Sequence, residues 1–132
     1  MPYRKLDVYQ KAYNEALEIH KITLTFPDSE KFAMAQQMRG ASKSIPVMIA
    51  EGMGKQESAD DVRRFVRMAL GSCDEMRVWL DFARDLKYLD QTVYKVHYDR
   101  YCEIGRMLNG LIKRFGPSKP MILSQKSQSL NQ

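Results

Sequence analysis

The sequence lacks any hydrophobic run long enough to cross a membrane. Its longest apolar stretch, residues 45–50, is six residues long, whereas a transmembrane helix needs roughly 20. The first ten residues, MPYRKLDVYQ, do not form the apolar core of a signal peptide. We therefore expect a cytoplasmic protein that makes no membrane contact.

Cysteine and histidine are scarce, with two of each among 132 residues. Cys73 and Cys102 lie within helical patterns, which indicates free thiols rather than a disulfide framework. Neither His20 nor His97 follows a glutamate by three residues, as a di-iron bundle requires, and the cysteines and histidines lack zinc-ligand spacing. No phosphate-binding loop, dinucleotide fingerprint or nucleophile elbow is present. The sequence predicts no metal, no cofactor and no enzymatic activity.

The net charge of +5 comes from the C-terminal end of the chain. Residues 1–103 carry 16 basic and 16 acidic side chains, which cancel. Residues 104–132 carry no acidic side chain and five basic ones, which are Arg106, Lys113, Arg114, Lys119 and Lys126. A basic end of this kind attracts polyanions in a salt-dependent manner.

Four segments repeat apolar residues at spacings of three and four, which predicts amphipathic helices. The first covers about residues 7–25, and the second about residues 30–51. The third follows an N-cap at Ser58 and runs to about residue 86. The fourth is capped by Asp90 or Thr92 and ends at about residue 115, before Gly116 and Pro117. We expect residues 1–117 to form one domain and residues 118–132 a flexible basic and polar tail.

Four helices joined by short loops predict an all-α fold, an antiparallel up-down-up-down four-helix bundle. A three-helix domain with a swapped helix is disfavoured because all four segments are comparably amphipathic. In the second helix the apolar spacing assigns a buried stripe to Phe32, Ala35, Met38, Ala41, Ser42, Ile45 and Ile49.

The stretch of residues 44–54, SIPVMIAEGMG, contains a proline inside the second helix. Pro46 removes one backbone hydrogen bond, which predicts a kink there. The hydroxyls of Ser42 and Ser44 are expected to satisfy the freed carbonyl groups. Gly52 and Gly54 are expected to supply the left-handed or otherwise unrestricted backbone that ends the helix.

Topology gathers basic residues at one end of the predicted bundle. In an up-down bundle the chain start, the turn after the second helix and the end of the fourth helix share one pole. Nucleic-acid binding is the leading functional hypothesis, because clustered basic side chains bind phosphates with little dependence on the base sequence. Asp60 and Asp61 offer the alternative that nearby arginines are paired and solvated. The candidate contacts are Lys55, Arg63, Arg64, Arg67, Lys113, Arg114 and Lys119.

The pattern SIP..IAEG.G at residues 44–54, followed by F...A.GS..E at residues 65–75, resembles the 23S ribosomal RNA intervening-sequence proteins. The resemblance covers roughly residues 3–115 and implies a helical bundle that assembles as a homopentameric ring without enzymatic activity. Relatives include the accessory protein of diversity-generating retroelements, a basic pentamer that binds nucleic acid and a reverse transcriptase. This chain departs from the family pattern at Gly40, where the family has arginine, and at Val47 and Met48, which replace Ser-Asn.

The motif residues are predicted to hold the second and third helices together. A hairpin that turns near residue 55 sets Arg39 opposite residues 71–75, where it can pair with Glu75. The same register brings Ser44 near Phe65 and Ala69, and lets two helix backbones approach closely at Gly71 and Ser72. The predicted structural set, an ion-pair and cap network that fixes register, is Arg39, Ser44, Pro46, Glu51, Gly52, Gly71, Ser72 and Glu75.

A second hypothesis is a protein-interaction scaffold that makes no direct nucleic-acid contact. Trp79, Phe82 and Tyr88 are candidate contacts, although contacts between subunits explain them equally well. Salt distinguishes the two hypotheses, because phosphate-driven binding weakens steeply as salt rises.

Overall fold

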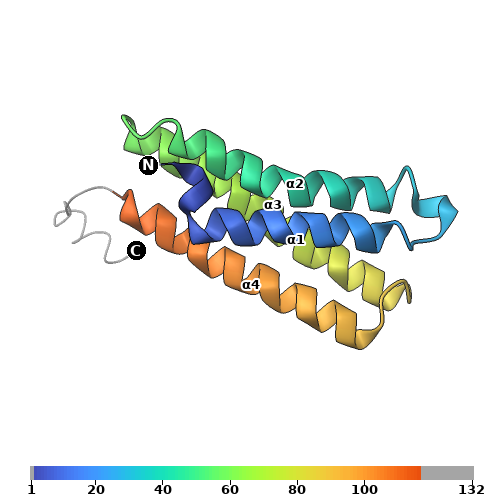
Figure 1. Cartoon of the computed structure of the whole chain (residues 1–132). Coiled ribbons are helices and arrows are strands. Elements are labelled where there is room, and N and C mark those ends of the chain that lie inside the picture. Colours follow the sequence, from blue (N-terminus) through green and yellow to red (C-terminus); the bar gives the residue numbers. More distant parts are fainter. Residues whose placement is uncertain (1, 117–132) are drawn as a thin grey trace, which may run out of the picture.

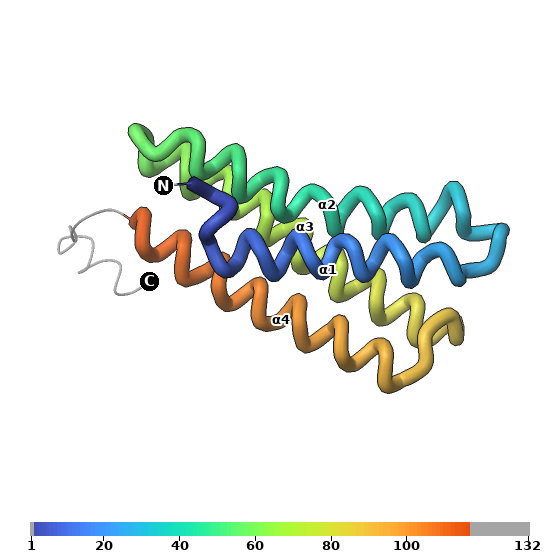
Figure 2. Tube along the Cα trace, in the orientation of Figure 1, coloured from blue at the N-terminus to red at the C-terminus, as the bar shows by residue number. Residues whose placement is uncertain are grey.

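The computed structural model describes residues 2–116, and these residues form helices and no strand. The long helices are α1 (Asp7–Thr23), α2 (Met34–Met53), α3 (Ala59–Asp85) and α4 (Gln91–Arg114). Two short 3-10 turns precede α1 and α2, η1 (Tyr3–Lys5) and η2 (Asp28–Glu30). The all-α four-helix architecture is therefore confirmed. Consecutive helices run in opposite directions along one long axis (Figures 1 and 2). The predicted tail, residues 118–132, lies outside the described residues.

Each helix contributes one apolar stripe to a shared core. α2 packs against α1 and α3, and α4 packs against α3 and α1, so the four helices close a ring in sequence order. The largest completely buried side chains come from all four helices and include Ile19, Met38, Ile45, Ile49, Leu80, Tyr101 and Leu108. Burying one such side chain contributes roughly 1.5–3 kcal/mol, so this core supplies most of the stability.

The two predicted N-caps agree with the structure. The backbone N–H of Asp61 donates to Ser58 Oγ at 3.2 Å, and the first turn of α3 carries two aspartates. The backbone N–H of Val93 donates to Asp90 Oδ1 at 2.8 Å, so Asp90 rather than Thr92 caps α4. A cap of this kind is worth about 1 kcal/mol.

The predicted start of the second helix is wrong. Residues 28–30 form η2, and α2 begins only at Met34, after Ala33 adopts a non-helical backbone (φ −125°, ψ −105°). The Met34 N–H donates to Glu30 Oε1 at 3.3 Å, which takes the place of a backbone partner. Phe32, assigned to the buried stripe, is 81% exposed because it lies before the helix begins.

α2 continues as an α-helix through Pro46. The Ser42 hydroxyl donates to the Arg39 carbonyl at 3.1 Å, and the Ser44 hydroxyl lies 2.9 Å from the Ala41 carbonyl. Both bonds reach back three residues, so neither satisfies the Ser42 carbonyl that Pro46 leaves free, and that expectation is wrong. The kink at Pro46 stays a prediction.

The C-terminal end of α2 also differs from the prediction that Gly52 and Gly54 end this helix in left-handed or otherwise unrestricted backbone geometry. Gly52 lies inside α2, and Gly54 at its C-terminus has φ −77°, which is right-handed. The one non-glycine residue with positive φ in the described range is Lys87 (φ 69°), in the turn between α3 and α4. The end of α2 therefore does not use left-handed glycine geometry, and α3 begins only after Ser58.

We expect alkaline pH to weaken the fold, because two buried groups, the Cys73 thiol and the Tyr94 hydroxyl, have raised pKa values. The Cys73 thiol donates to the Tyr101 carbonyl at 3.1 Å, and burial raises its pKa from 9.0 to about 12. Burial and the hydrogen bond to Asp81 raise the pKa of Tyr94 to about 12. Above pH 9 the folded chain holds protons that the unfolded chain has lost, so this stability is complete below pH 9 and decreases towards pH 12. We expect Cys73 alone to account for about 2 kcal/mol lost by pH 11.

Urea unfolding at pH 8.5 and pH 11 measures this loss. Cys73→Ala removes the titrating thiol, so its free energy of unfolding is expected to vary less between the two pH values. Equal pH dependence in both proteins would contradict the assignment to Cys73.

Candidate nucleic-acid interface

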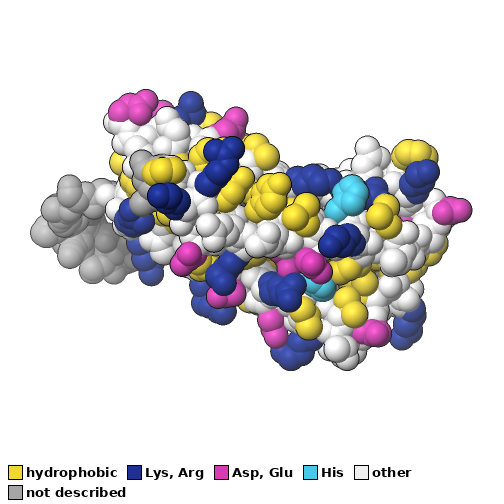
Figure 3. Space-filling view, viewed as in Figure 1, with side chains coloured by type: hydrophobic (Ala, Val, Ile, Leu, Met, Phe, Trp, Pro, Cys, Tyr) yellow, Lys and Arg dark blue, Asp and Glu magenta, His cyan; other side chains and the backbone are white. Residues whose placement is uncertain are grey.

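The structure brings five of the predicted basic residues, Lys55, Arg63, Arg64, Lys113 and Arg114, to one end of the bundle, whereas Arg67 lies further along α3. The chain start, the turn between α2 and α3 and the end of α4 lie at the same end (Figure 1), and Lys and Arg side chains appear there in Figure 3. We define this end as the basic pole, with the residues Arg4, Lys5, Lys55, Arg63, Arg64, Lys113 and Arg114. Lys119, also a candidate, lies outside the described residues.

Arg63 has a structural role. Its guanidinium donates to the Phe115 carbonyl and contacts the Asp60 carboxylate, and only 14% of its side chain is exposed. It thereby ties the start of α3 to the end of α4 and satisfies a carbonyl beyond the last turn of α4. Arg63 is not free to bind phosphate.

Arg64 and Lys55 both lie beside the ring of Phe65. The Arg64 guanidinium lies 4.5 Å from the ring centroid and 3.7 Å from the Asp61 carboxylate. Lys55 Nζ lies 5.6 Å from the same centroid. Arg64 is 59% exposed in this weak ion pair, so it remains able to contact an anion at the surface.

Three exposed basic residues have no ion-pair partner within residues 2–116 and lie along the outer side of α3 and α4. Arg67 lies one turn before Leu70, which lines a hollow of about 250 Å³ between α3 and α4. Arg106 lines the same hollow from α4, and Lys113 follows it by two helical turns, on the same face. We call these residues, Arg67, Arg106 and Lys113, the α3/α4 strip.

Arg106 is the one member of the strip absent from the predicted contacts. The charge count places it in the acid-free end of the chain, and its seven-residue spacing to Lys113, which the sequence interpretation did not use, is the signal for a shared face. Its position beside α3 depends on how two helices pack, which no local pattern specifies.

The predicted pair of Arg39 and Glu75 does not form. Glu75 instead accepts a hydrogen bond from Trp79 Nε1 at 3.1 Å, and Arg39 Nε is buried without a hydrogen-bond partner. Ser44 Oγ lies 2.5 Å from Ser72 Oγ. This contact sets Ser44 level with residue 72 rather than with residues 65–69, because the hairpin turns about three residues later than predicted. Residue 77, not Glu75, is therefore level with Arg39.

The motif glycines have different environments. A Cβ at Gly52 would lie 3.2 Å from Phe65 Cβ and 3.5 Å from the Val62 carbonyl oxygen, so Gly52 marks the close approach of α2 and α3. A Cβ at Gly71 would meet nothing within 4 Å, and the prediction that Gly71 allows close packing is wrong.

Other motif residues line surface hollows. Pro46 and Glu51 line a groove between α1 and α2, and Glu51 is exposed rather than part of an ion-pair network. A hollow of about 450 Å³ between α2 and α3 is lined by Gln36, Gln37, Gly40, Ala41, Ser44, Ser72 and Glu75.

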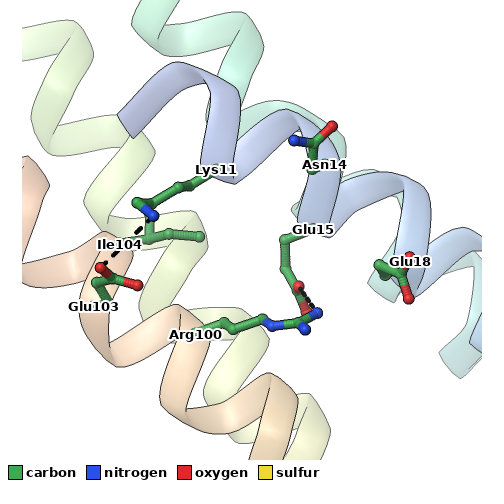
Figure 4. Close-up of a pocket in the computed structure, with 7 residues that line it drawn as sticks. All are labelled: Lys11, Asn14, Glu15, Glu18, Arg100, Glu103 and Ile104. Atoms are coloured by element: carbon green, nitrogen blue, oxygen red, sulfur yellow. Dashed lines mark hydrogen bonds and ion pairs between the residues drawn. The ribbon is translucent and has the colours of Figure 1, made fainter. Parts of the chain in front are cut away.

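A buried ionic cluster, which the sequence interpretation missed, joins α1 to α4. Glu15 is 2% exposed, and its carboxylate contacts His97 Nδ1 and accepts a bond from Arg100 at 3.1 Å. Figure 4 shows Glu15 and Arg100 pointing towards each other from facing helices. Glu15 falls at i+3 from Ala12 on the apolar stripe of α1, which was the available signal. The cluster fixes the two helices, and within residues 2–116 no group of acidic, histidine or cysteine residues has metal-binding geometry.

None of the described helices combines the length and the apolar character that crossing a membrane requires.

Comparisons with known proteins agree with the fold. A family model described as 23S rRNA-intervening sequence protein matches residues 4–110. A solved structure from Bacteroides thetaiotaomicron, described as a protein with unknown function from the S23 ribosomal protein family, has a TM-score of 0.75 and 24% identity. The match covers 86% of this chain and 99% of that one. At this identity it shows a shared fold. No curated protein matches the chain.

Proposed function

The chain belongs to the 23S rRNA-intervening sequence protein family, and we propose that it is a non-enzymatic, self-associating bundle protein that binds nucleic acid through its basic surface. The α3/α4 strip is the observation that carries this proposal. Its side chains are exposed, and no acidic side chain among residues 2–116 pairs with them. Basic side chains in a row contact successive phosphates without reading sequence.

Self-association is supported by an exposed apolar face on α3. Met68, Val78 and Phe82 are 47%, 54% and 52% exposed and share one helix face with Gly71. Exposed apolar side chains that repeat along one helix face are typical of protein interfaces, and the exposed Glu75 lies between Met68 and Val78 on this face. In a closed ring, which we propose is a pentamer, each copy would present its own strip, so weak phosphate contacts would add through avidity.

Removal of charge from the strip tests the proposal. We expect Arg106→Gln with Lys113→Gln to reduce the slope of log affinity against log salt by about 2 per chain, because each lost phosphate contact lowers it by about 1. Anisotropy of a labelled RNA duplex across a salt series measures this slope. The matched control, Lys21→Gln with Lys31→Gln, removes the same charge from two exposed lysines outside the strip and the basic pole.

Equal slopes in the two double variants would show that only net charge matters and not the strip. Absence of any affinity for RNA or DNA at low salt would end the nucleic-acid proposal.

The competing function is an interaction scaffold with no direct nucleic-acid contact. Phe82 and the half-buried Trp79, whose rings lie 5.9 Å apart, favour it because aromatic side chains dominate protein interfaces. The family resemblance suggests a reverse transcriptase as the partner. Retention of such an enzyme at high salt, without measurable RNA affinity of the chain itself, would favour the scaffold.

A further inference from the structure

A second unpartnered surface, separate from the α3/α4 strip, lies between α1 and α2. It is a groove of about 400 Å³, within the usual range for ligand sites. Tyr13, Leu17 and Val47 line it and are 48%, 48% and 51% exposed. Figure 3 shows apolar side chains gathered over this part of the molecule with basic side chains beside them. We call it the α1/α2 groove.

Three tyrosines form a row along the groove. The ring centroids of Tyr3 and Tyr9 are 5.0 Å apart, and those of Tyr9 and Tyr13 are 5.9 Å apart. Tyr9 and Tyr13 are one helical turn apart on α1, so a rigid element sets their spacing. Tyr3 meets Tyr9 at an interplanar angle of 69°, whereas Tyr9 and Tyr13 are tilted by only 31°, so Tyr9 and Tyr13 are the rings that offer faces on which nucleobases stack, whatever their sequence.

Basic side chains border the same groove. Lys43 lines it, and the Arg4 guanidinium lies 5.0 Å from the centroid of Tyr3. Lys5 follows Arg4 on η1, and Glu51 is the one acidic residue that lines the groove. Lys43 and Glu51 offset each other in the lining of the groove, so the net positive charge that favours an anionic ligand comes from Arg4 beside Tyr3.

The hollow between α2 and α3 has neither the aromatic rings nor the basic side chains of the α1/α2 groove. No lysine, arginine or aromatic side chain lines it, and it carries Glu75. Glycine and serine at its surface let another helix approach closely. The two surfaces therefore suit different partners, another copy of the chain on the α2/α3 side and an aromatic polyanion on the α1/α2 side.

We propose that the α1/α2 groove binds unpaired bases of single-stranded nucleic acid, which stack on Tyr9 and Tyr13 while the adjoining phosphates meet Arg4 and Lys43. This inference rests on the proposed nucleic-acid binding and adds a separate site for the unpaired part of the ligand. The α3/α4 strip contacts phosphates of either a duplex or a single strand, whereas the groove requires exposed base faces.

Two labelled RNA probes test the groove, an oligouridylate and a blunt duplex of equal charge. Tyr13→Ala is expected to weaken oligouridylate binding about 10-fold, since one base loses its stacking partner. Duplex affinity is expected to change less than twofold. Tyr13→Phe keeps the ring and is expected to retain oligouridylate affinity. Leu24→Ala, a matched control at the end of α1 (65% exposed, outside the groove), is expected to leave both affinities unchanged.

The outcomes separate this inference from the proposed function. Duplex binding with no dependence of oligouridylate affinity on Tyr13 overturns the groove site alone, whereas binding of neither probe by the unmodified chain overturns both. A smaller assembly of Tyr13→Ala in sedimentation, with unchanged RNA affinity, would assign the groove to another copy and overturn the inference. Ultraviolet crosslinking of 5-bromouridine RNA to the unmodified chain is expected at Tyr9 or Tyr13, and crosslinks confined to α3 and α4 would contradict it.

Discussion

Glu15→Ala is expected to lower the free energy of unfolding by about 2–3 kcal/mol, the upper range of costs for leaving a buried polar group without its hydrogen-bond partner. The Glu15 carboxylate is 2% exposed and contacts both His97 and Arg100. Its removal leaves the buried His97 without its partner and leaves a void where α1 meets α4. Urea unfolding at pH 7 measures the loss.

Glu18→Ala is the matched control. Glu18 lines the same hollow as Glu15 (Figure 4) but is exposed and forms no ion pair within residues 2–116, so its loss is expected to cost less than about 0.5 kcal/mol. Arg100→Ala is expected to cost about 1 kcal/mol, because half of the Arg100 side chain is in water. A Glu15→Ala cost as small as that of Glu18→Ala would show that the buried cluster does not hold the two helices together.

The number, type and approximate limits of the helices were predictable from the sequence, because those signals are local. Apolar spacing of three and four marks a helix wherever it packs, and Ser58 and Asp90 cap helices within one turn of themselves. η2 was missed because a 3-10 turn and an α-helix share the same short-range pattern. The exposed Phe32 follows from that error.

The register of α2 against α3 was not predictable from these patterns. It depends on where the loop between α2 and α3 is centred, and α2 continues through Gly52, which lies close to Phe65, to Met53. A shift of about three residues then separates Arg39 from Glu75 and brings Ser44 to Ser72. An error in the predicted position of the loop between α2 and α3 shifts the register of the two helices. Every predicted residue pair between them is then wrong by the same shift.

The basic surface was predicted in part. The sequence located the excess charge and offered the pairing with Asp60 and Asp61, which the structure confirms for Arg63 and Arg64. It did not show that Arg106 lies beside Leu70, one turn after Arg67, since that requires the packing of α3 on α4. Buried Glu15 was missed for a similar reason: an acidic residue on an apolar stripe is tolerated only when a facing helix supplies its partners.

Gly52→Val is expected to destabilise the bundle by about 2–3 kcal/mol, at the upper end of overpacking costs. A side chain at this position meets Phe65 Cβ at 3.2 Å, and Cβ is fixed to the backbone of α3, so it cannot move aside without separating the helices. The branches of valine add further contact with the Val66 side chain, whose Cγ2 lies 3.7 Å from the Cβ position. Thermal and urea unfolding of the variant measure the cost.

Gly71→Ala is expected to change stability in the opposite direction from Gly52→Val, although both glycines belong to the pattern shared with the family. Gly71 lies inside α3 with open space around its Cβ position, so alanine is expected to stabilise the isolated chain by about 0.5–1 kcal/mol through helix propensity alone. At concentrations where copies associate, the added methyl instead lies on the face proposed for self-association. A gain in stability of the dilute chain with a weaker assembly would assign Gly71 to the contact between copies. A gain at every concentration with unchanged assembly would contradict the exposed apolar face of α3 as that contact, because a helix packed closely against Gly71 would leave no space for a methyl group.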